Sequence, residues 1–279
     1  MPDSSLLIKL AAVLFGLAGV FYIWRVFVCE TAGRLVSLIP IVGSIILCFG
    51  VVGRSVEMQQ VPFTNLSGAL AFMALALAVI YLLMEQRRRI GALGTFVFGV
   101  ATIALLISIF APQQINLIPL TAPTNLWGMI HFGASLLAYV AFTLAFLASI
   151  TYMLQEYMLK RKQITRLQRH LPSLDMMDDL AYRMVTLGFL LLTVGIIAGV
   201  LWVQSTLREL LVSKGIWLLI TWLVYAAYLH VRVVRGWQGK WSNRLLVLGF
   251  ACILAGFISV LVACFGADST YFNLHRFEW

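Results

Sequence analysis

The sequence predicts an all-α fold, a polytopic membrane bundle of about eight transmembrane helices. Hydrophobic residues make up 62% of the 279 positions and charged residues only 11%, which is too little polar surface to cover a water-soluble globule of this size. Apolar runs of about 20 residues, enough to cross about 30 Å of hydrocarbon as a helix, recur along the whole chain. The runs are apolar on every face, which favours helices over a membrane β-barrel. We expect a single transmembrane domain over residues 1–279.

In chain order, the apolar runs span residues 5–25, 34–52, 66–84, 90–111, 125–156, 183–203, 215–235 and 242–266. The first run is long and has neither a basic start nor a convincing cleavage site, so we expect a span and not a cleavable signal. The fifth run is longer than one crossing requires. We therefore expect its last turns, residues 154–160, to project into water.

The lysines and arginines predict the orientation of the bundle. One set of alternate loops holds Arg25, Arg34, Arg87, Arg88, Arg89, Lys160, Arg161, Lys162, Arg166, Arg169, Arg183, Arg232, Arg235, Lys240 and Arg244, and the other set holds Lys9, Arg54, Arg208, Lys214 and Arg276. Because basic loops stay in the cytoplasm, we expect the richer set to face inward, with both termini outside. The formal charge of +9 is then a topology signal and a contact with the lipid bilayer. The basic residues are dispersed over short loops, which disfavours a nucleic-acid partner.

Cysteine spacing excludes two functions. Cys29, Cys48, Cys252 and Cys264 form no C-x-x-C pair, so the sequence predicts neither covalent c-type haem nor a thiol oxidoreductase. No cluster of cysteines and histidines has the spacing of zinc ligands.

Three of the four histidines lie in or next to predicted spans. His131 opens the fifth run and His275 follows the last, so both are expected at the outer face, where two imidazoles can ligate one haem iron. His230 lies about 22 Å beyond Gly215 along the seventh run, toward the other leaflet. Position alone leaves open an interfacial role for His131 and a solvated tail for His275, whereas a buried ionisable group such as His230 often has a function.

The local sequences around these histidines carry a resemblance. They are residues 131–139 (HFGASLLAY), 187–199 (LGFLLLTVGIIAG) and 217–230 (WLLITWLVYAAYLH). Their succession resembles the cytochrome c assembly family of System II haem-handling proteins, CcsA and its HemX relatives, over residues 125–279. The resemblance implies that His131 and His275 are axial metal ligands of a transient, non-covalent haem b that is presented to apocytochrome c. It also implies that His230 ligates haem within the membrane with help from a CcsB-like partner, and that the chain is a possible component of a cytochrome c haem lyase.

The chain departs from that family between its sixth and seventh runs. Family members carry a tryptophan-rich external loop with a Trp-Asp-Pro-Lys signature, and here residues 202–217 keep only Trp202, Lys214 and Trp217 as candidate haem-binding residues. We expect residues 205–212 to form a short amphipathic helix on the outer membrane surface. Arg208 or Lys214 is a candidate partner for a haem propionate, and simple interfacial anchoring is the alternative.

Three function classes remain open from the sequence. The first is a haem-handling protein of c-type cytochrome biogenesis in the bacterial cytoplasmic membrane. The second is a HemX-like accessory or regulatory protein linked to haem synthesis, which the altered tryptophan loop favours. The third is a small-molecule transporter, which is disfavoured because the carboxylates fall in loops or at helix ends.

Overall fold

The computed structural model describes residues 3–27, 33–59, 61–87, 90–111, 126–161, 172–202 and 208–266. Regular structure in this part of the chain consists of eight helices, and all eight are long and apolar enough to cross a membrane. They are α1 (Ser4–Phe27), α2 (Gly33–Met58), α3 (Leu66–Arg87), α4 (Gly91–Phe110), α5 (Leu126–Lys160), α7 (Leu174–Trp202), α8 (Arg208–Arg235) and α9 (Lys240–Gly266). The predicted all-α membrane bundle is confirmed, with one helix for each predicted run.

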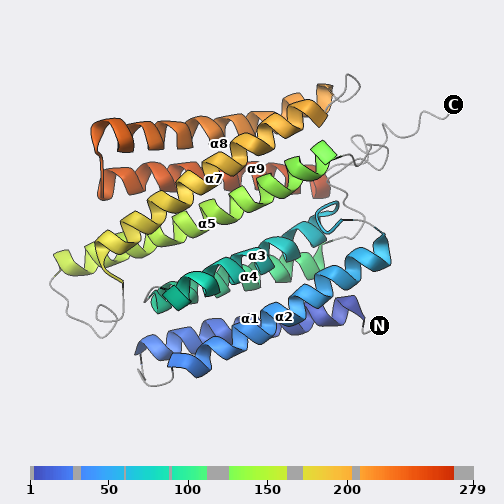
Figure 1. Cartoon of the computed structure of the whole chain (residues 1–279), viewed down its shortest axis with the longest axis horizontal. Coiled ribbons are helices and arrows are strands. Elements are labelled where there is room, and N and C mark those ends of the chain that lie inside the picture. Colours follow the sequence, from blue (N-terminus) through green and yellow to red (C-terminus); the bar gives the residue numbers. More distant parts are fainter. Residues whose placement is uncertain are drawn as a thin grey trace.

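The helices lie side by side along the long axis of the molecule (Figure 1). Helices α1 to α4 pack against one another, α8 packs against α7 and α9, and α5 contacts α3, α4, α7 and α9. A continuous buried core extends from α1 to α9. Helix α5 therefore joins the two halves of the bundle.

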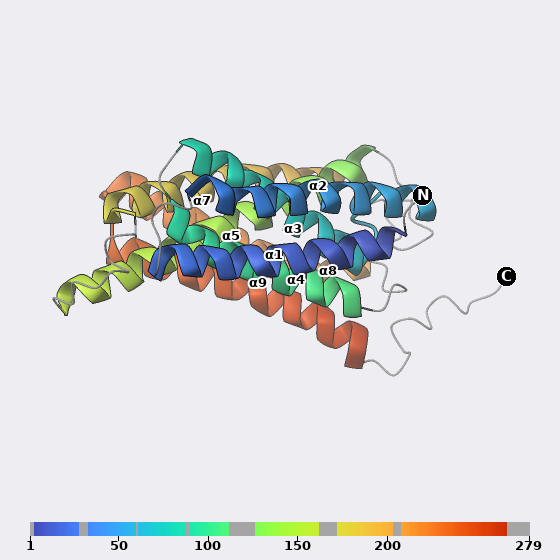
Figure 2. The same cartoon turned by 90° about the horizontal axis from the view of Figure 1, so that it is seen from below.

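The bundle has two ends, which we name after one residue each. Helices α1, α3, α5 and α8 begin at the His131 end, and α2, α4, α7 and α9 begin at the Asp178 end. Helix α5 has 35 residues, and its last turns extend beyond the neighbouring helices at the Asp178 end (Figures 1 and 2). The extension agrees with the over-long fifth run in the sequence.

Two predicted boundaries are wrong. Helix α7 begins at Leu174, nine residues before the predicted start at 183, because Ser173 caps it by accepting a hydrogen bond from the Met176 amide at 3.3 Å. Helix α8 is continuous from Arg208, so its first turns are part of the spanning helix and not a separate surface helix at 205–212. The continuation is physically reasonable, since a helix accommodates Gly215 at a cost of about 1 kcal/mol.

Candidate functional site

The His131 ring is fixed by a hydrogen bond to the backbone of α7. His131 is half-buried in the second turn of α5, and its Nδ1 lies 2.7 Å from the carbonyl oxygen of Gly195. Because a carbonyl oxygen only accepts hydrogen bonds, Nδ1 is the donor, and the tautomer that makes this bond has its lone pair on Nε2. A histidine that donates through one nitrogen to a backbone carbonyl is oriented to ligate a metal through the other.

Glycines on α7 make room for this ring. A Cβ at Gly199 would lie 2.6 Å from Nδ1 of His131, and a Cβ at Gly195 would lie 2.6 Å from Oγ of Ser135, one turn further along α5. Residues without side chains allow two helix backbones to approach closely. The glycines of the 187–199 segment therefore leave space for the His131 side chain between α5 and α7, a role that the sequence did not reveal.

Aromatic side chains from four elements form a cluster that includes His131. Its ring lies nearly parallel to that of Trp202, with centroids 6.3 Å apart and 17° between planes, and edge-on to that of Phe132 at 4.9 Å. Phe63, from the segment between α2 and α3, stacks on Phe132 at 6.4 Å and meets Phe72 of α3 edge-on at 6.1 Å. We call Phe63, Phe72, His131, Phe132 and Trp202 the His131 cluster. It combines one imidazole with flat apolar faces.

The structure brings together only part of the predicted site. Trp202, the last residue of α7, joins His131 as expected. Trp217 instead packs on α9, where a Cβ at Gly256 would lie 3.1 Å from the Cβ of Trp217. His275 lies outside the described residues, and so does the side chain of Lys214 on α8. The pairing of His131 with His275 therefore stays a prediction.

His230 lies at the other end of the bundle and faces outward. It is exposed, five residues before the end of α8. It belongs to a stripe of exposed positions along that helix: Ile216, Leu219, Leu223, Ala227, His230 and Val234. Within the described part of the chain, no residue hydrogen-bonds its ring. At 1.5 Å per residue, His230 is about 25 Å further from the His131 end than His131 itself, so the two rings cannot ligate one iron.

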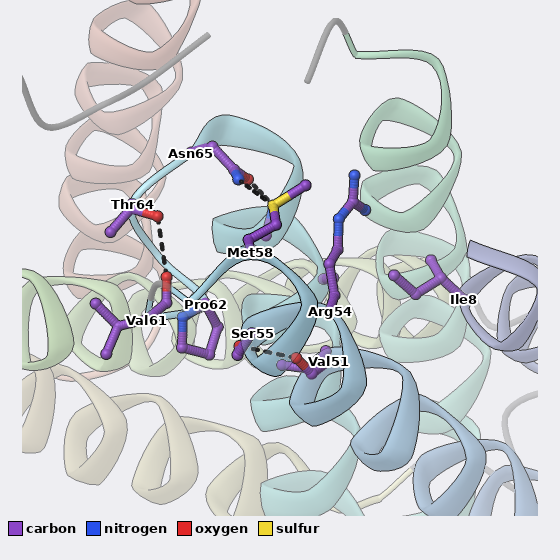
Figure 3. A pocket seen from close by; sticks show the side chains of 11 residues that line it. Ile8, Val51, Arg54, Ser55, Met58, Val61, Pro62, Thr64 and Asn65 are labelled. Atoms are coloured by element: carbon purple, nitrogen blue, oxygen red, sulfur yellow. Dashed lines mark hydrogen bonds between the residues drawn. The ribbon is translucent and has the colours of Figure 1, made fainter. Parts of the chain in front are cut away.

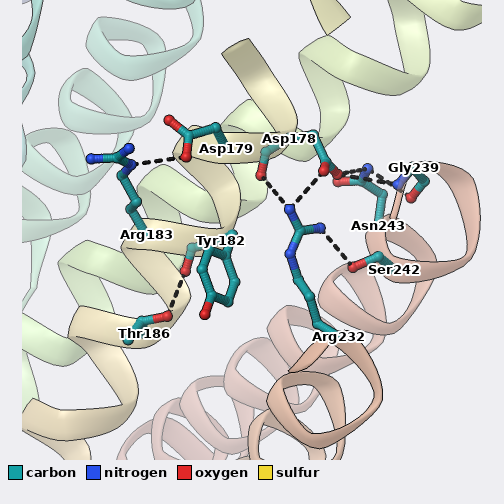
Figure 4. A network of polar contacts seen from close by, with 9 residues as sticks. All are labelled: Asp178, Asp179, Tyr182, Arg183, Thr186, Arg232, Gly239, Ser242 and Asn243. Atoms are coloured by element: carbon teal, nitrogen blue, oxygen red, sulfur yellow. Dashed lines mark hydrogen bonds and ion pairs between the residues drawn. The ribbon is translucent and has the colours of Figure 1, made fainter. Parts of the chain in front are cut away.

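A buried ion pair holds α8 in place at the Asp178 end (Figure 4). Nη2 of Arg232 lies 2.7 Å from Oδ2 of Asp178, with 10% and 12% of the two side chains exposed. Oδ1 of Asp178 accepts from the amide of Gly239 and from Nδ2 of Asn243, both at 3.3 Å. The Arg232 guanidinium also lies over the Tyr182 ring, 4.8 Å from its centroid. Sequence reasoning missed this network, because it treated Arg232 only as a topology signal.

Comparison with known proteins decides the family. The family model described as Cytochrome C assembly protein matches residues 63–267, which is most of the chain. The chain belongs to the cytochrome c assembly protein family. This confirms the resemblance, and the match begins before residue 125, so it includes Phe63 and helices α3 and α4 as well as the second half.

Relatives of this family member cover most of its length. It is 30% identical over 274 residues to a protein named cytochrome c biogenesis protein CcsA from Parasynechococcus marenigrum (strain WH8102), covering 88% of this chain and 87% of the relative. A protein of the same name from Synechococcus sp. (strain CC9605) is 30% identical over 296 residues, covering 96% and 94%. One from Guillardia theta is 28% identical over 248 residues, covering 81% and 79%.

Proposed function

We propose that this family member binds haem b non-covalently through His131 and presents it during the assembly of c-type cytochromes. Its family and its CcsA relatives support a role in c-type cytochrome biogenesis. The observation that carries the haem assignment is the hydrogen bond from Nδ1 of His131 to Gly195, which reserves Nε2 for a metal. Haem supplies the reactive vinyl groups and the iron, and the protein supplies ligation, orientation and an apolar wall.

The residues around His131 fit a porphyrin. Trp202 and Phe132 offer flat apolar surfaces next to the imidazole, and aromatic faces stack well on a macrocycle. In this chain the His131 cluster takes the place of the tryptophan-rich loop that residues 202–217 lack. We propose that His275 would be the second residue to hold the haem, as the family resemblance implies.

The exposed His230 points to a second membrane protein. An imidazole that faces hydrocarbon is unfavourable unless another group binds it. The stripe that contains His230 is apolar apart from that residue and has Ala227 one turn earlier, which lets a neighbouring helix approach. We propose that a CcsB-like partner docks here and completes the transmembrane haem position.

We propose that the Asp178 end faces the cytoplasm of a bacterial cell and that both termini lie outside. The described basic side chains at that end are Arg25, Arg87, Lys160, Arg161, Arg183, Arg232, Arg235 and Arg244. The His131 end holds Lys9 and Arg54 within the same described part. This asymmetry is the one that the positive-inside rule associates with cytoplasmic exposure. His131 would then present haem on the side where c-type cytochromes are completed.

An absorption spectrum tests the haem proposal. Protein purified from haem-replete membranes should show the Soret and α bands of a low-spin bis-imidazole haem, and His131→Ala should lose them. Added imidazole should restore the spectrum of His131→Gly, because it can fill the vacated ligand position. Met129→Ala is the matched control, since Met129 lies on the same helix turn and is 43% exposed. Wild-type protein that neither carries nor takes up haem would refute the proposal.

The accessory function is the second candidate, because residues 202–217 lack the Trp-Asp-Pro-Lys signature. Deletion of the protein separates the two functions. Loss of mature c-type cytochromes supports haem presentation and a part in a haem lyase, whereas intact cytochromes with altered haem precursors support a HemX-like role. Ion-coupled transport is disfavoured, since the described carboxylates lie within about two turns of a helix end: Asp3, Glu57, Glu85, Glu156, Asp175, Asp178 and Asp179.

A further inference from the structure

Arg54 is a buried cation that forms no ion pair with a carboxylate of the described residues. It lies on α2, one turn before that helix ends at the His131 end, and is 9% exposed. Its described hydrogen bond runs from Nη1 to Oγ of Ser67 at 3.0 Å. Glu57, three residues further along α2, attracts Arg54 electrostatically, but its carboxylate accepts a hydrogen bond from Ser4 and forms no direct ion pair with Arg54 in the described structure. Since a guanidinium stays charged, its burial is unfavourable until an anion binds it.

A small cavity lies beside this side chain (Figure 3). Its volume is about 10 Å³, room for one oxygen-sized group, and Arg54, Ser55, Thr64 and Asn65 are the polar residues that line it. Nδ2 of Asn65 donates to Sδ of Met58 at 3.5 Å. A thioether is a weak acceptor, so this amide gains by exchanging it for a charged oxygen. A second donor therefore serves the same cavity.

We propose that Arg54 and Asn65 form a binding site for an anionic oxygen group at the His131 end of the bundle. The ligand chemistry is a carboxylate or phosphate on an amphiphilic molecule, such as a haem propionate or a lipid headgroup. A planar guanidinium matches either group, and each supplies the direct ion pair that Glu57 does not form with Arg54. The site differs from the His131 cluster in its residues, since it is built on α2 and the segment that precedes α3.

One short segment connects the two sites. Pro62, Thr64 and Asn65 line the cavity, while Phe63 between them stacks on Phe132 beside His131. Asn65 fixes the segment by accepting a hydrogen bond from the Gly68 amide at 2.7 Å. If the anion is a haem propionate, the inference rests on the proposed function, and this segment contacts the ligand on both sides. If the anion is a lipid phosphate, the inference stands without haem.

The test compares two anion sources with matched variants. Arg54→Gln removes the charge. Met58→Glu retains Arg54 and places a carboxylate one turn away on the cavity wall, which satisfies Arg54 within the chain. Val56→Glu controls for a carboxylate added to α2 at an exposed position that does not line the cavity, and Arg87→Gln controls for loss of an exposed arginine at the other end. Haem and its dimethyl ester are titrated into each protein, and phosphatidylglycerol retained from nanodiscs is measured by native mass spectrometry.

Two results support the site and one overturns it. A propionate ligand predicts that wild-type protein and both controls prefer haem to the diester by about 10-fold or more, and that Arg54→Gln and Met58→Glu lose this preference. A lipid phosphate predicts that these two variants lose one bound phosphatidylglycerol that the wild type and controls retain. If the wild type shows neither effect, or the two variants match the controls in both, there is no anion site. His131→Ala is titrated in parallel. Wild-type protein that takes up no haem, or a His131→Ala variant that binds haem as well as the wild type, refutes the proposed function, while the lipid measurement still decides the role of Arg54.

Discussion

The buried pair between Asp178 and Arg232 makes the sharpest prediction about stability. Removing one partner of a fully buried ion pair costs about 3–5 kcal/mol, because the other charge is left uncompensated. Here the side chains are 10% and 12% exposed, so water relieves part of the penalty and we expect a loss of about 2–4 kcal/mol for Arg232→Gln. The matched control is Arg183→Gln. Its pair with Asp179 also has a short contact of 2.9 Å, but the side chains are 61% and 40% exposed, and we expect a loss of about 0.5 kcal/mol.

The assay is the free energy of unfolding in mixed micelles, titrated with SDS and followed by circular dichroism. Asp178→Asn, Arg232→Gln and the double variant complete a cycle that isolates the pair. We expect the double variant to lose less stability than the two single variants added together, by about 1 kcal/mol or more, because no charge is then left buried alone. The reasoning is refuted if Arg232→Gln loses no more stability than Arg183→Gln, or if the two single losses simply add.

Three further predictions follow from the site and its orientation. Gly199→Ala should abolish or strongly weaken the haem spectrum, because its Cβ would lie 2.6 Å from the His131 ring. Gly133→Ala is the control and should leave the spectrum unchanged, since no atom lies within 4 Å of its Cβ. An intact spectrum in Gly199→Ala would argue against the role of Gly199 in making room for His131. Phe63→Ala should lower haem retention by about 3- to 10-fold at unchanged Soret position, measured by transfer to apomyoglobin, since it removes one stacked ring and no ligand. Ser173→Cys should react with a membrane-impermeant maleimide only in inverted vesicles and Gln59→Cys only in intact cells; the reverse pattern would overturn the proposed orientation.

The spans were predictable because hydrocarbon imposes a simple length rule on apolar helices. Twenty apolar residues leave a strong local signal, and each of the eight predicted runs corresponds to a helix. The start of α7 was not predictable by that rule, because its first turns carry Asp175, Asp178 and Asp179, which read as loop residues. Asp178 is buried in the helix because Arg232, 54 residues further along the chain, pairs with it, and because Gly239 and Asn243 also donate to it.

The sequence identified some residues of the candidate site but not how the site is built. His131 and Trp202 were visible from the order of local motifs. The Gly195 carbonyl, the space at Gly199 and the ring of Phe63 depend on which helices are neighbours, and a single sequence contains no such information. Arg54 is a comparable case, since the burial of its charge without a direct ion pair becomes apparent only when the side chains around it are known.

The ion pair and the outward histidine are connected by helix geometry. Successive residues of an α-helix are about 100° apart, so Arg232 and His230 lie about 200° apart around α8. Because Asp178 draws Arg232 toward α7, it turns His230 away from the bundle. The same pair therefore stabilises the α7–α8–α9 packing and presents an imidazole to a partner. On the proposed function, the chain ligates haem alone near one end and jointly with another subunit near the other, because about 25 Å along the bundle separates the two rings.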